Sequence, residues 1–415
     1  MPSERVVWLP KKEWATARHC EILESIWQAP HFKLVYEALE SIALQPLLVG
    51  GVVRDLLLDR ANNDVDLIVN CAPRKLMKMG SKLSKLTSAT PVPLDKERGT
   101  LRLCFSPELE VDLVALQGET LLEDLNNRDL TINAMAIDPR GRLADPTGGL
   151  ADLQKGKIRD IRAENFTEDP LRVIRALRFS AQLNFAIDDS TLRHANEAVD
   201  GLERVAGERI NSELGKFFDH ARSQQVHLLR EIGVAEALLF LPSYGWQQLT
   251  EAVSKAPVGL ALGLALWFGP CLKTQHSDPL FSRLKLSRKL QRFLTSFWRG
   301  ARKVRASKEM PLGEIFELSK ATGEAFQALA RALQLQTFPT KLSSHSRERI
   351  RVEASGEGSL RWDPTPWNGD ELKAAMGKEP GPWLGKAIRV LETQWAVGEV
   401  QNLEQGVRYL EDRST

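Results

Sequence analysis

The sequence PLLVGGVVRDLLLDRANNDVDLIV, residues 46–69, decides the fold class. Its first residues, Pro46 to Gly50, are typical of a short buried strand, and Val52 to Leu58 have the apolar spacing of a helix. Val65 to Val69 is a second apolar strand. A strand, a glycine turn, a helix and another strand in one short segment indicate an α/β unit.

Outward from this segment, the chain separates into an α/β part and a helical part. Two more strands are predicted at Gly99–Phe105 and Leu109–Val114, and from about residue 168 the pattern is helical almost to the end. We therefore expect an α/β head with a mixed sheet and helices, followed by an elongated all-α neck, body and tail. The expected segments are an N-terminal helical extension at 1–45, the head at 46–160, the neck at 161–222, the helical body at 223–336, and a linker with a helical tail at 337–415.

The composition is that of a globular protein in a reducing compartment. The chain has 415 residues and 43% hydrophobic content, enough for at least one large core. Its 56 Lys and Arg residues nearly balance 54 Asp and Glu residues, so the net charge of +2 identifies no partner. The four cysteines form no Cys-x-x-Cys pair, which argues against a zinc site or a disulfide framework and favours the cytoplasm. The most apolar run, 258–271, is broken by glycine and proline and falls short of the roughly 20 residues of a membrane span, so it predicts a buried helix and no membrane partner.

Gly50 and Gly51 stand where the first strand turns into the helix. Because glycine has no side chain, backbone N–H groups can approach an anion closely there, at the positive end of a helix. A phosphate group is the natural ligand. Glycine pairs also occur in ordinary turns, so the pair alone does not distinguish the two readings.

A pair of carboxylates follows the glycine turn. Asp64 and Asp66 share one face of the second strand, about 6–7 Å apart, because side chains alternate along a strand. Such a pair repels unless a cation lies between its members, and oxygen-only ligands suit Mg²⁺. A solvated strand end is the alternative for an isolated Asp-x-Asp, but a phosphate cradle beside it matches two-metal phosphoryl transfer. Glu110 and Asp112 share a face of a later strand, and either one could supply the third carboxylate.

Five motifs, in order over about 170 residues, resemble those of the class II tRNA nucleotidyltransferase and bacterial poly(A) polymerase family, within the polymerase β-like superfamily. They are Gly50 to Asp55 with Asp64-Val65-Asp66; Arg128 to Ala136; Asp145 to Gly149 with Asp152 and Leu153; Glu168 to Arg172 continuing through Arg175, Arg178 and Phe179; and Glu208 to Ile210 with Glu213 and Lys216. The resemblance implies that the second motif binds ribose and triphosphate, the third is a hinge, the fourth selects the nucleotide and the fifth braces the neck. It implies Mg²⁺ held by Asp64 and Asp66, and a nucleotide bound by Gly50, Gly51, Arg54, Arg128, Asp129, Asn133, Asp169, Arg172, Arg175 and Arg178.

The fourth motif also has a physical interpretation of its own. Asp169 and Arg172 are three residues apart, so on a helix they project from one face, where an acceptor beside a donor fork can read the Watson–Crick edge of a base. Arg175 and Arg178 extend the same side and would meet the charge of a triphosphate. A surface ion pair at the start of a helix is the alternative.

The segment between Glu110 and Arg128 bears on the choice of nucleotide. Family members that add the whole CCA sequence carry a flexible loop there, which helps the pocket switch from CTP to ATP. Only 17 residues, 111–127, fill the gap, so the loop looks deleted, as in the CC-adding branch. Asn127 stands where the family usually has arginine, which puts ribose or triphosphate contact at that position in question.

We therefore expect an enzyme that adds CC to the 3′ end of tRNA from CTP and releases pyrophosphate. A separate A-adding enzyme would then act on the product. Full CCA addition with CTP and ATP is the main alternative. Poly(A) polymerase is disfavoured because its members keep the loop, and a catalytically silent RNA-binding protein is disfavoured because the motif residues are intact.

A basic segment is the expected contact with tRNA. Residues 281–308 carry ten positive charges and no acidic residue, the electrostatic pattern of a surface that binds a phosphate backbone. The candidate contacts are Arg283, Lys285, Arg288, Lys289 and Arg292. An ordinary solvated basic helix face is the alternative. The tryptophans of the tail, Trp362, Trp367, Trp383 and Trp395, are expected to pack in a core rather than to stack on bases.

Overall fold

The computed structural model describes residues 6–60, 65–106, 109–239, 246–269, 277–336 and 340–413, with the backbone alone described for Asp66, Leu239, Ser277 and Asp278. The chain forms two compact units. Unit 1 comprises Met1–Val205 with Glu231–Leu238, and unit 2 comprises Ala206–Arg230 with Leu239–Thr415. The finer division into head, neck, body and tail at the residues given above stays a prediction.

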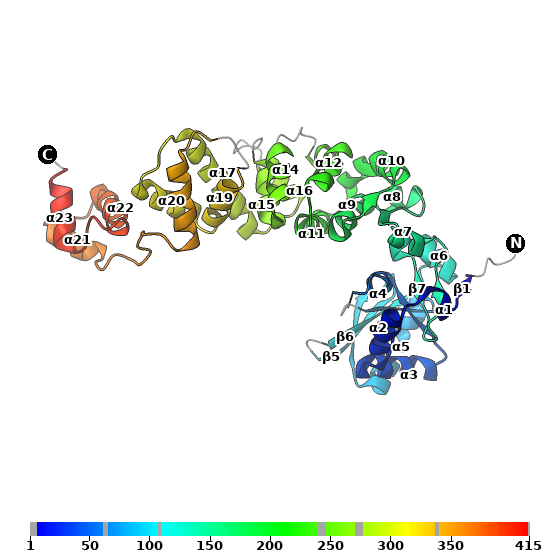
Figure 1. Ribbon diagram of the computed structural model, residues 1–415. Coiled ribbons are helices and arrows are strands. Elements are labelled where there is room, and N and C mark those ends of the chain that lie inside the picture. Colours follow the sequence, from blue (N-terminus) through cyan, green and yellow to red (C-terminus); the bar gives the residue numbers. More distant parts are fainter. Residues whose placement is uncertain are drawn as a thin grey trace. The chain divides into compact units, whose positions relative to one another are not determined.

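Unit 1 is built on a mixed sheet, which has eight strands within the described residues (Figure 1). In spatial order they are β1 (Trp8–Leu9), β8 (Leu143–Ala144), β7 (Ala136–Ile137), β2 (Pro46–Val49), β3 (Asp66–Val69), β6 (Leu109–Ala115), β5 (Thr100–Ser106) and β4 (Thr90–Asp95). Strands β3 and β6 run parallel, and the other neighbouring pairs are antiparallel. The predicted mixed sheet is thus confirmed, and the four strands predicted from apolar runs form its centre and one side.

The central strands are buried on both faces because helices cover the sheet. Leu48 and the run Leu67 to Val69 have no exposed surface. Helix α5 (Pro73–Thr87) packs on β4, β5 and β6, and α3 (Pro30–Ser41) packs on α5. Helix α2 (Ala17–Gln28) contacts both α3 and α4 (Gly51–Leu57), the helix that follows the glycine turn. The central strands therefore read as continuous apolar runs rather than as alternating patterns.

The N-terminal segment is only partly the helical extension that was expected. It contains α1 (Lys11–Trp14), α2 and α3, but it begins with β1, which pairs with β8 at the edge of the sheet. The indole Nε1 of Trp14 donates to the carbonyl oxygen of Gly141 at 3.1 Å, which ties α1 to the turn before β8. A two-residue strand is too short to produce a detectable period in the sequence.

Unit 1 continues with short elements that carry the predicted motifs. They are α6 (Leu121–Asn126), η1 (Thr131–Asn133), α7 (Gly149–Gln154), β9 (Lys157–Ile158), α8 (Glu164–Glu168), α9 (Leu171–Leu183), β10 (Ala186–Ile187), α10 (Asp189–Ala198) and η2 (Val199–Arg204), with α13 (Val234–Leu239) contributed from later in the chain. Strands β9 and β10 form a parallel pair. Ten of the thirteen residues of α9 are buried, Arg178 among them, so other parts of the protein cover most of the helix surface.

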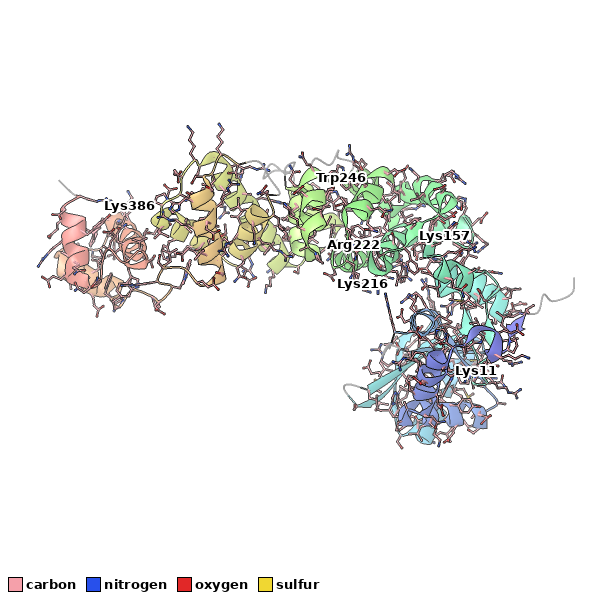
Figure 2. All side chains as sticks on the ribbon, viewed as in Figure 1. Lys11, Lys157, Lys216, Arg222, Trp246 and Lys386 are labelled. Atoms are coloured by element: carbon pink, nitrogen blue, oxygen red, sulfur yellow. The ribbon has the colours of Figure 1, made fainter. Side chains whose placement is uncertain are left out.

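The described part of unit 2 is helical. Its elements are α11 (Gly207–Phe218), α12 (Ser223–Glu231), α14 (Trp246–Lys255), α15 (Gly259–Phe268), α16 (Ser277–Arg283), α17 (Arg288–Ala306), α18 (Leu312–Thr322), α19 (Ala325–Gln334), α20 (Ser344–Ser355), α21 (Gly369–Met376), α22 (Pro382–Ala396) and α23 (Leu403–Glu411). Helix α15 is the buried helix predicted from the apolar run, and its Trp267 packs against Trp246 at a ring distance of 5.4 Å (Trp246 is labelled in Figure 2). Of the helices described here, none combines the length and apolarity needed to cross a membrane.

Candidate active site

The glycine turn between β2 and α4 has the geometry that requires glycine. Gly50 has φ +68°, a conformation that other residues rarely adopt. A Cβ atom at this position would lie 3.0 Å from Nη1 of Arg128, so the turn and this arginine approach each other closely. The structure therefore brings the first and second motifs together.

Strand register relates Asp66 to one of the two acidic residues of β6. Asp66 and Asp112 are register partners on the parallel strands β3 and β6, and register partners in a sheet share one face. Glu110 lies two residues before Asp112 on the same strand, toward the beginning of β6. Register thus makes Asp112, rather than Glu110, the carboxylate beside Asp66. Asp64 lies outside the described residues, as does the side chain of Asp66.

Arg102 on β5 binds both acidic residues of β6, a contact that we did not predict. Its Nε and Nη2 donate to Oδ1 and Oδ2 of Asp112 at 2.7 and 2.9 Å, and Nη1 lies 2.6 Å from Oε2 of Glu110. These hydrogen bonds raise the pKa of Arg102, chiefly through Asp112. The available signal was a single basic residue between Leu101 and Leu103 in an otherwise apolar strand.

An unbroken chain of hydrogen bonds joins four predicted nucleotide-binding residues. Arg54 Nη1 donates to Oδ1 of Asn133 at 2.8 Å, and Nδ2 of Asn133 donates to Oδ1 of Asp129 at 3.1 Å. Arg175 Nε and Nη2 lie 2.8 and 2.7 Å from Oδ2 of Asp129. The chain runs from α4 through η1 to α9, so the sheet and the following helices meet at these four side chains.

Asp129 stays ionised in this network despite its burial. Burial alone would raise the pKa of this carboxyl, which is 5% exposed. The charge of Arg175 and the hydrogen bonds from Asn133, Arg175 and the Leu130 N–H outweigh that effect and hold the pKa below its ordinary value. The site thus keeps a buried negative charge among arginines.

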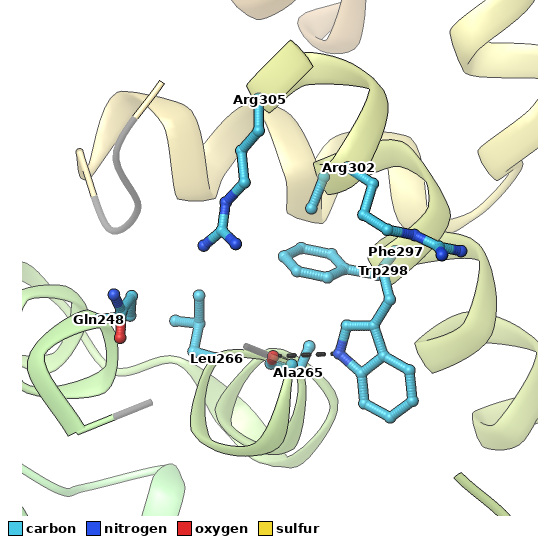
Figure 3. A pocket seen from close by; sticks show the side chains of 9 residues that line it. Gln248, Ala265, Leu266, Phe297, Trp298, Arg302 and Arg305 are labelled. Carbon is cyan, nitrogen blue, oxygen red and sulfur yellow. Dashed lines mark hydrogen bonds between the residues drawn. The ribbon is translucent and has the colours of Figure 1, made fainter. Parts of the chain in front are cut away.

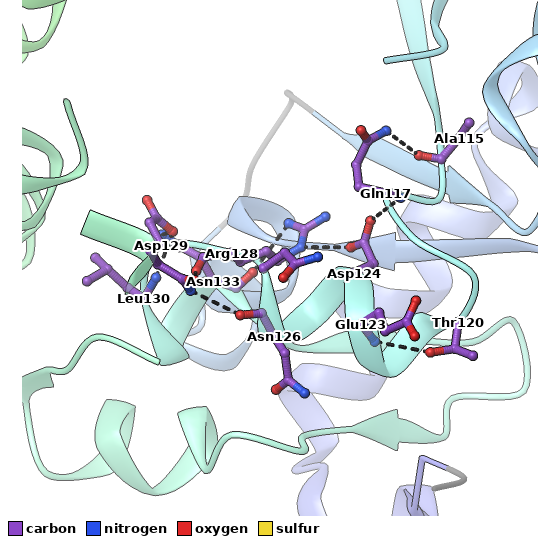
Figure 4. Close-up of polar contacts among 12 residues, drawn as sticks. Ala115, Gln117, Thr120, Glu123, Asp124, Asn126, Arg128, Asp129, Leu130 and Asn133 are labelled. Carbon is purple, nitrogen blue, oxygen red and sulfur yellow. Dashed lines mark hydrogen bonds and ion pairs between the residues drawn. The ribbon is translucent and has the colours of Figure 1, made fainter. Parts of the chain in front are cut away.

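Arg128 is oriented by the segment that precedes it. Its Nε donates to Oδ2 of the buried Asp124 at 3.1 Å, and its Nη1 donates to the carbonyl oxygen of Asn133 at 3.4 Å (Figure 4). Asp124 in turn accepts the backbone N–H of Gln117 at 2.9 Å. Helix α6 therefore aims Arg128 at the glycine turn.

A cluster of cations surrounds the ring of Phe179. The guanidinium carbons of Arg54, Arg175 and Arg178 lie 4.9, 5.6 and 3.8 Å from the ring centroid. The ring is 4% exposed and so provides a rigid apolar platform for the three arginines. Together with Arg128 they form a concentration of positive charge suited to a polyphosphate.

Asp169 and Arg172 do not lie on one helical face, as we had expected. Asp169 is in an extended conformation between α8 and α9, and Arg172 is the second residue of α9. The physical reason is Pro170, because a residue that precedes proline is driven out of the helical region. The two residues remain close, since the Arg172 N–H donates to the carbonyl oxygen of Asp169 at 3.0 Å.

The third motif, at 145–153, contacts η1 through Asp152 and Gly149. Asp152 Oδ2 accepts hydrogen bonds from Thr131 Oγ1 at 2.7 Å and from Arg159 Nε at 2.9 Å. A Cβ atom at position 149 would lie 2.2 Å from the carbonyl oxygen of Thr131, so only glycine permits this packing. The motif thus fixes the segment that carries Asp129 and Asn133.

The predicted RNA-binding residues belong to unit 2. Of the ten basic residues in 281–308, eight are exposed, while Arg283 and Arg305 are partly buried. Arg305 lines a pocket with Phe297, Leu266 and Gln248 (Figure 3), and burial lowers the pKa of its guanidinium. Gly207 at the start of α11 packs on the turn before α17, where a Cβ would lie 2.1 Å from the carbonyl oxygen of Arg283.

The tail tryptophans divide between the core and the surface. Trp367 is buried and packs edge-on against Trp395 at a ring distance of 5.7 Å. Trp383 packs partly buried against the same cluster. Trp362 is 48% exposed and contacts Phe316. The packing prediction is therefore confirmed for all but Trp362.

Comparison with known proteins adds three matching domain families. Residues 47–159 match the poly A polymerase head domain, 184–244 match the RNA and SrmB binding site of polymerase A, and 266–408 match tRNA nucleotidyltransferase domain 2. The CC-adding tRNA nucleotidyltransferase of Geobacter sulfurreducens is 42% identical over 173 residues, which span 41% of this chain and 40% of that protein. The CC-adding tRNA nucleotidyltransferase of Synechocystis is 27% identical over 89% of this chain and 93% of that protein.

Solved structures share the fold along nearly the whole chain. The structure of the Thermotoga maritima CCA-adding enzyme complexed with tRNA has a TM-score of 0.73 and 22% identity, covering 94% of this chain and 98% of that one. This likeness concerns the fold.

Proposed function

The chain belongs to the family of poly A polymerases and tRNA nucleotidyltransferases, and within that family we propose that it adds two cytidines to the 3′ end of tRNA from CTP and releases pyrophosphate. It is an enzyme, a nucleotidyltransferase of the CC- or CCA-adding kind. The addition of C alone, without A, is the finer part of the proposal. A separate enzyme of A-adding activity would complete the product.

One observation carries the choice of CC addition. Strand β6 ends at Ala115, α6 begins at Leu121, and α6 ends at Asn126, two residues before Arg128. Gln117 in the short connection is tied down, since its N–H donates to Asp124 and its Nε2 donates to the carbonyl oxygens of Arg98 and Ala115 at 2.7 and 3.0 Å. A connection so short and so fixed offers no flexible segment to reshape the pocket for a second base.

The proposed triphosphate site combines the glycine turn with the arginines. Gly50 and Gly51 let the backbone approach the phosphates, and Arg128 lies against that turn. Arg54, Arg175 and Arg178 supply further positive charge around Phe179. Asp129 holds Arg175 through Oδ2 and so keeps that guanidinium at the proposed triphosphate site.

Cytosine is proposed to be read by Asp169 and Arg172. The Watson–Crick edge of cytosine offers an amino donor and two acceptors, which match a carboxylate beside a guanidinium. Uracil instead presents an N–H at the central position, where it would face the donors of Arg172. Burial lowers the pKa of Arg172, and the nearby carboxylates of Asp129 and Asp169 oppose that effect.

We propose Asp64, Asp66 and Asp112 as carboxylate ligands of two Mg²⁺ ions. Asp112 and Asp66 are register partners, and both carry the oxygen ligands that Mg²⁺ prefers. Among the described side chains no group of three or more acidic, His or Cys residues is suited to a metal, a statement that does not extend to Asp64 or to the side chain of Asp66. When bound, the two ions would activate the 3′ hydroxyl of tRNA and neutralise the leaving pyrophosphate.

The exposed basic face of α17 and the preceding turn is the proposed contact with the tRNA backbone. Lys285, Arg288, Lys289 and Arg292 are all exposed there, without acidic neighbours in sequence. Phosphate contacts of this kind position a nucleic acid without reading its sequence.

Separate incubations test the proposal. A tRNA transcript that lacks CCA is mixed with one labelled nucleotide at a time, with and without a chelator. We expect incorporation from CTP alone, and its loss with chelator. Incorporation from ATP or UTP at a similar rate, or activity that survives the chelator, would contradict the proposal.

A further inference from the structure

Asn165 is a fully buried polar residue on α8 that belongs to none of the motif positions assigned above, although it lies between two of them. Its Nδ2 donates to the carbonyl oxygens of Asn126 and Arg128, at 3.0 and 2.6 Å. Its Oδ1 accepts from Nη2 of Arg162 at 2.7 Å. Every hydrogen-bonding group of this amide is therefore engaged, and both of its donors hold one segment.

Arg172 contacts the same segment. Its Nη2 donates to the carbonyl oxygen of Asn127 at 2.7 Å, and its Nη1 donates to the carbonyl oxygen of Asn165 at 3.2 Å. Three consecutive carbonyl oxygens, those of Asn126, Asn127 and Arg128, thus accept hydrogen bonds from Asn165 and Arg172. These hydrogen bonds join residues 126–128, which directly precede Asp129, to Arg172, the residue proposed to read the base.

We propose that Asn165 is a positioning residue that sets the orientation of Arg172, and thereby the preference for CTP over UTP. This inference rests on the proposed function. Arg172 binds the carbonyl oxygen of Asn127, and the Asn165 side chain holds the carbonyl oxygens on either side of it, those of Asn126 and Arg128. The direction of the remaining Arg172 donors therefore depends on Asn165 through the position of this segment. Uracil differs from cytosine along the Watson–Crick edge, so the direction of these Arg172 donors decides how well each of the two bases is bound.

An asparagine is the side chain that this position requires. Aspartate would turn an acceptor toward the carbonyl oxygens of Asn126 and Arg128, and leucine would leave both without a partner in a buried place. Asn127, which stands where the family usually has arginine, takes part in the same set of contacts. Its Oδ1 accepts a hydrogen bond from Nη2 of Arg162 at 3.0 Å. The exposed Arg162 thus bridges the side chains of Asn127 and Asn165 and adds a second link between α8 and this segment.

The test measures kcat and KM separately for CTP and UTP, using a tRNA that lacks CCA, in the full-length Asn165→Leu protein. The matched control is Thr87→Val on α5, which also removes a buried side-chain hydrogen bond but lies outside the site. We expect the CTP over UTP preference to fall about tenfold in Asn165→Leu, equivalent to about 1.4 kcal/mol, chiefly through KM for CTP. Thr87→Val should keep the wild-type preference for CTP over UTP, while its Tm falls by about as much as that of Asn165→Leu.

Arg162→Met keeps the inference testable if Asn165→Leu does not fold, because it spares the Nδ2 contacts. We expect a smaller loss of preference, about threefold, in the same direction. An unchanged preference in the folded variant, or an equal loss in Thr87→Val, overturns the role of Asn165. A wild-type protein that does not use CTP at all overturns the proposed function itself, so the two failures are distinguishable.

Discussion

Arg102 donates hydrogen bonds to both carboxylate oxygens of Asp112, with Nε 2.7 Å from Oδ1 and Nη2 2.9 Å from Oδ2. The pair joins neighbouring strands, and Asp112 is at the same time the register partner of Asp66. One arginine thus orients the carboxylate proposed as the third metal ligand.

Asp112→Asn should lower the turnover of CTP by more than about 100-fold, because even outer partners of a metal ligand are worth 10–100-fold. Glu110→Gln is the matched control on the same strand, and it should cost less than about tenfold. Steady-state incorporation at saturating Mg²⁺ measures both, with Tm as the check on folding. A larger loss in Glu110→Gln would reassign the third carboxylate.

Arg102→Met should lower the Mg²⁺ concentration needed for half-maximal activity. A guanidinium on the same carboxylate competes with the metal and adds a repelling charge, so its removal favours metal binding. We expect a shift of about threefold to tenfold, together with tighter binding of Mn²⁺ measured by electron paramagnetic resonance. A higher Mg²⁺ requirement would mean that orientation of Asp112 outweighs competition.

Arg175→Met should destabilise unit 1 in a pH-dependent way. The folded-state pKa of Asp129 is held below its ordinary 3.8, so the ionised group stabilises the fold above that pH, and this contribution is lost as the pH falls through the folded pKa. Without Arg175, burial remains and the pKa rises. We expect a loss of about 1–3 kcal/mol at pH 7, less than for a fully buried pair because Arg175 is one-third exposed.

Denaturant unfolding at pH 7 and at about pH 3, below the ordinary pKa of the carboxyl, measures this effect, and the difference between wild type and Arg175→Met should shrink at the lower pH. Arg18→Met is the control, because the pair of Arg18 with Glu21 is exposed on both sides. It should change stability little at either pH. An equal loss at both pH values would show that Arg175 stabilises by packing alone.

The basic face of α17 should set the salt dependence of tRNA binding. Replacing Arg288, Lys289 and Arg292 together by Gln should make the slope of log K against log salt shallower by about 2–3, since each phosphate contact contributes about 0.7–0.9. Exposed Lys78, Lys82 and Lys85 of α5, changed in the same way, are the charge-matched control. An unchanged slope for α17 would mean that its charges are merely solvated.

The central strands and the helical remainder could be predicted because each leaves a local pattern. Leu67 to Val69 of β3 form a continuous apolar run that is buried on both faces, and α15 is apolar all round. Strands β1, β7 and β8 are two residues long and exist only through their partners in the sheet, so their local sequence carries no period.

The site was predictable where a motif is continuous in sequence, and less so where contacts cross between elements. The chain of contacts from Arg54 to Arg175 joins residues that the motifs had named, but their mutual hydrogen bonds depend on the tertiary fold. The extended conformation of Asp169 was readable from Pro170, and the helical assumption was wrong for that reason. Asn165 gave no signal, since a single asparagine before an acidic motif looks like a helix start.

The most direct measurement is the 3′-terminal sequence of the product made from CCA-lacking tRNA with CTP and ATP both present. The account predicts that the mass of the RNA increases by two cytidines and then stops, however long the incubation. A terminal adenosine after the two cytidines would contradict CC-only addition and restore full CCA addition. No extension under any nucleotide mixture would contradict the proposed activity as a whole.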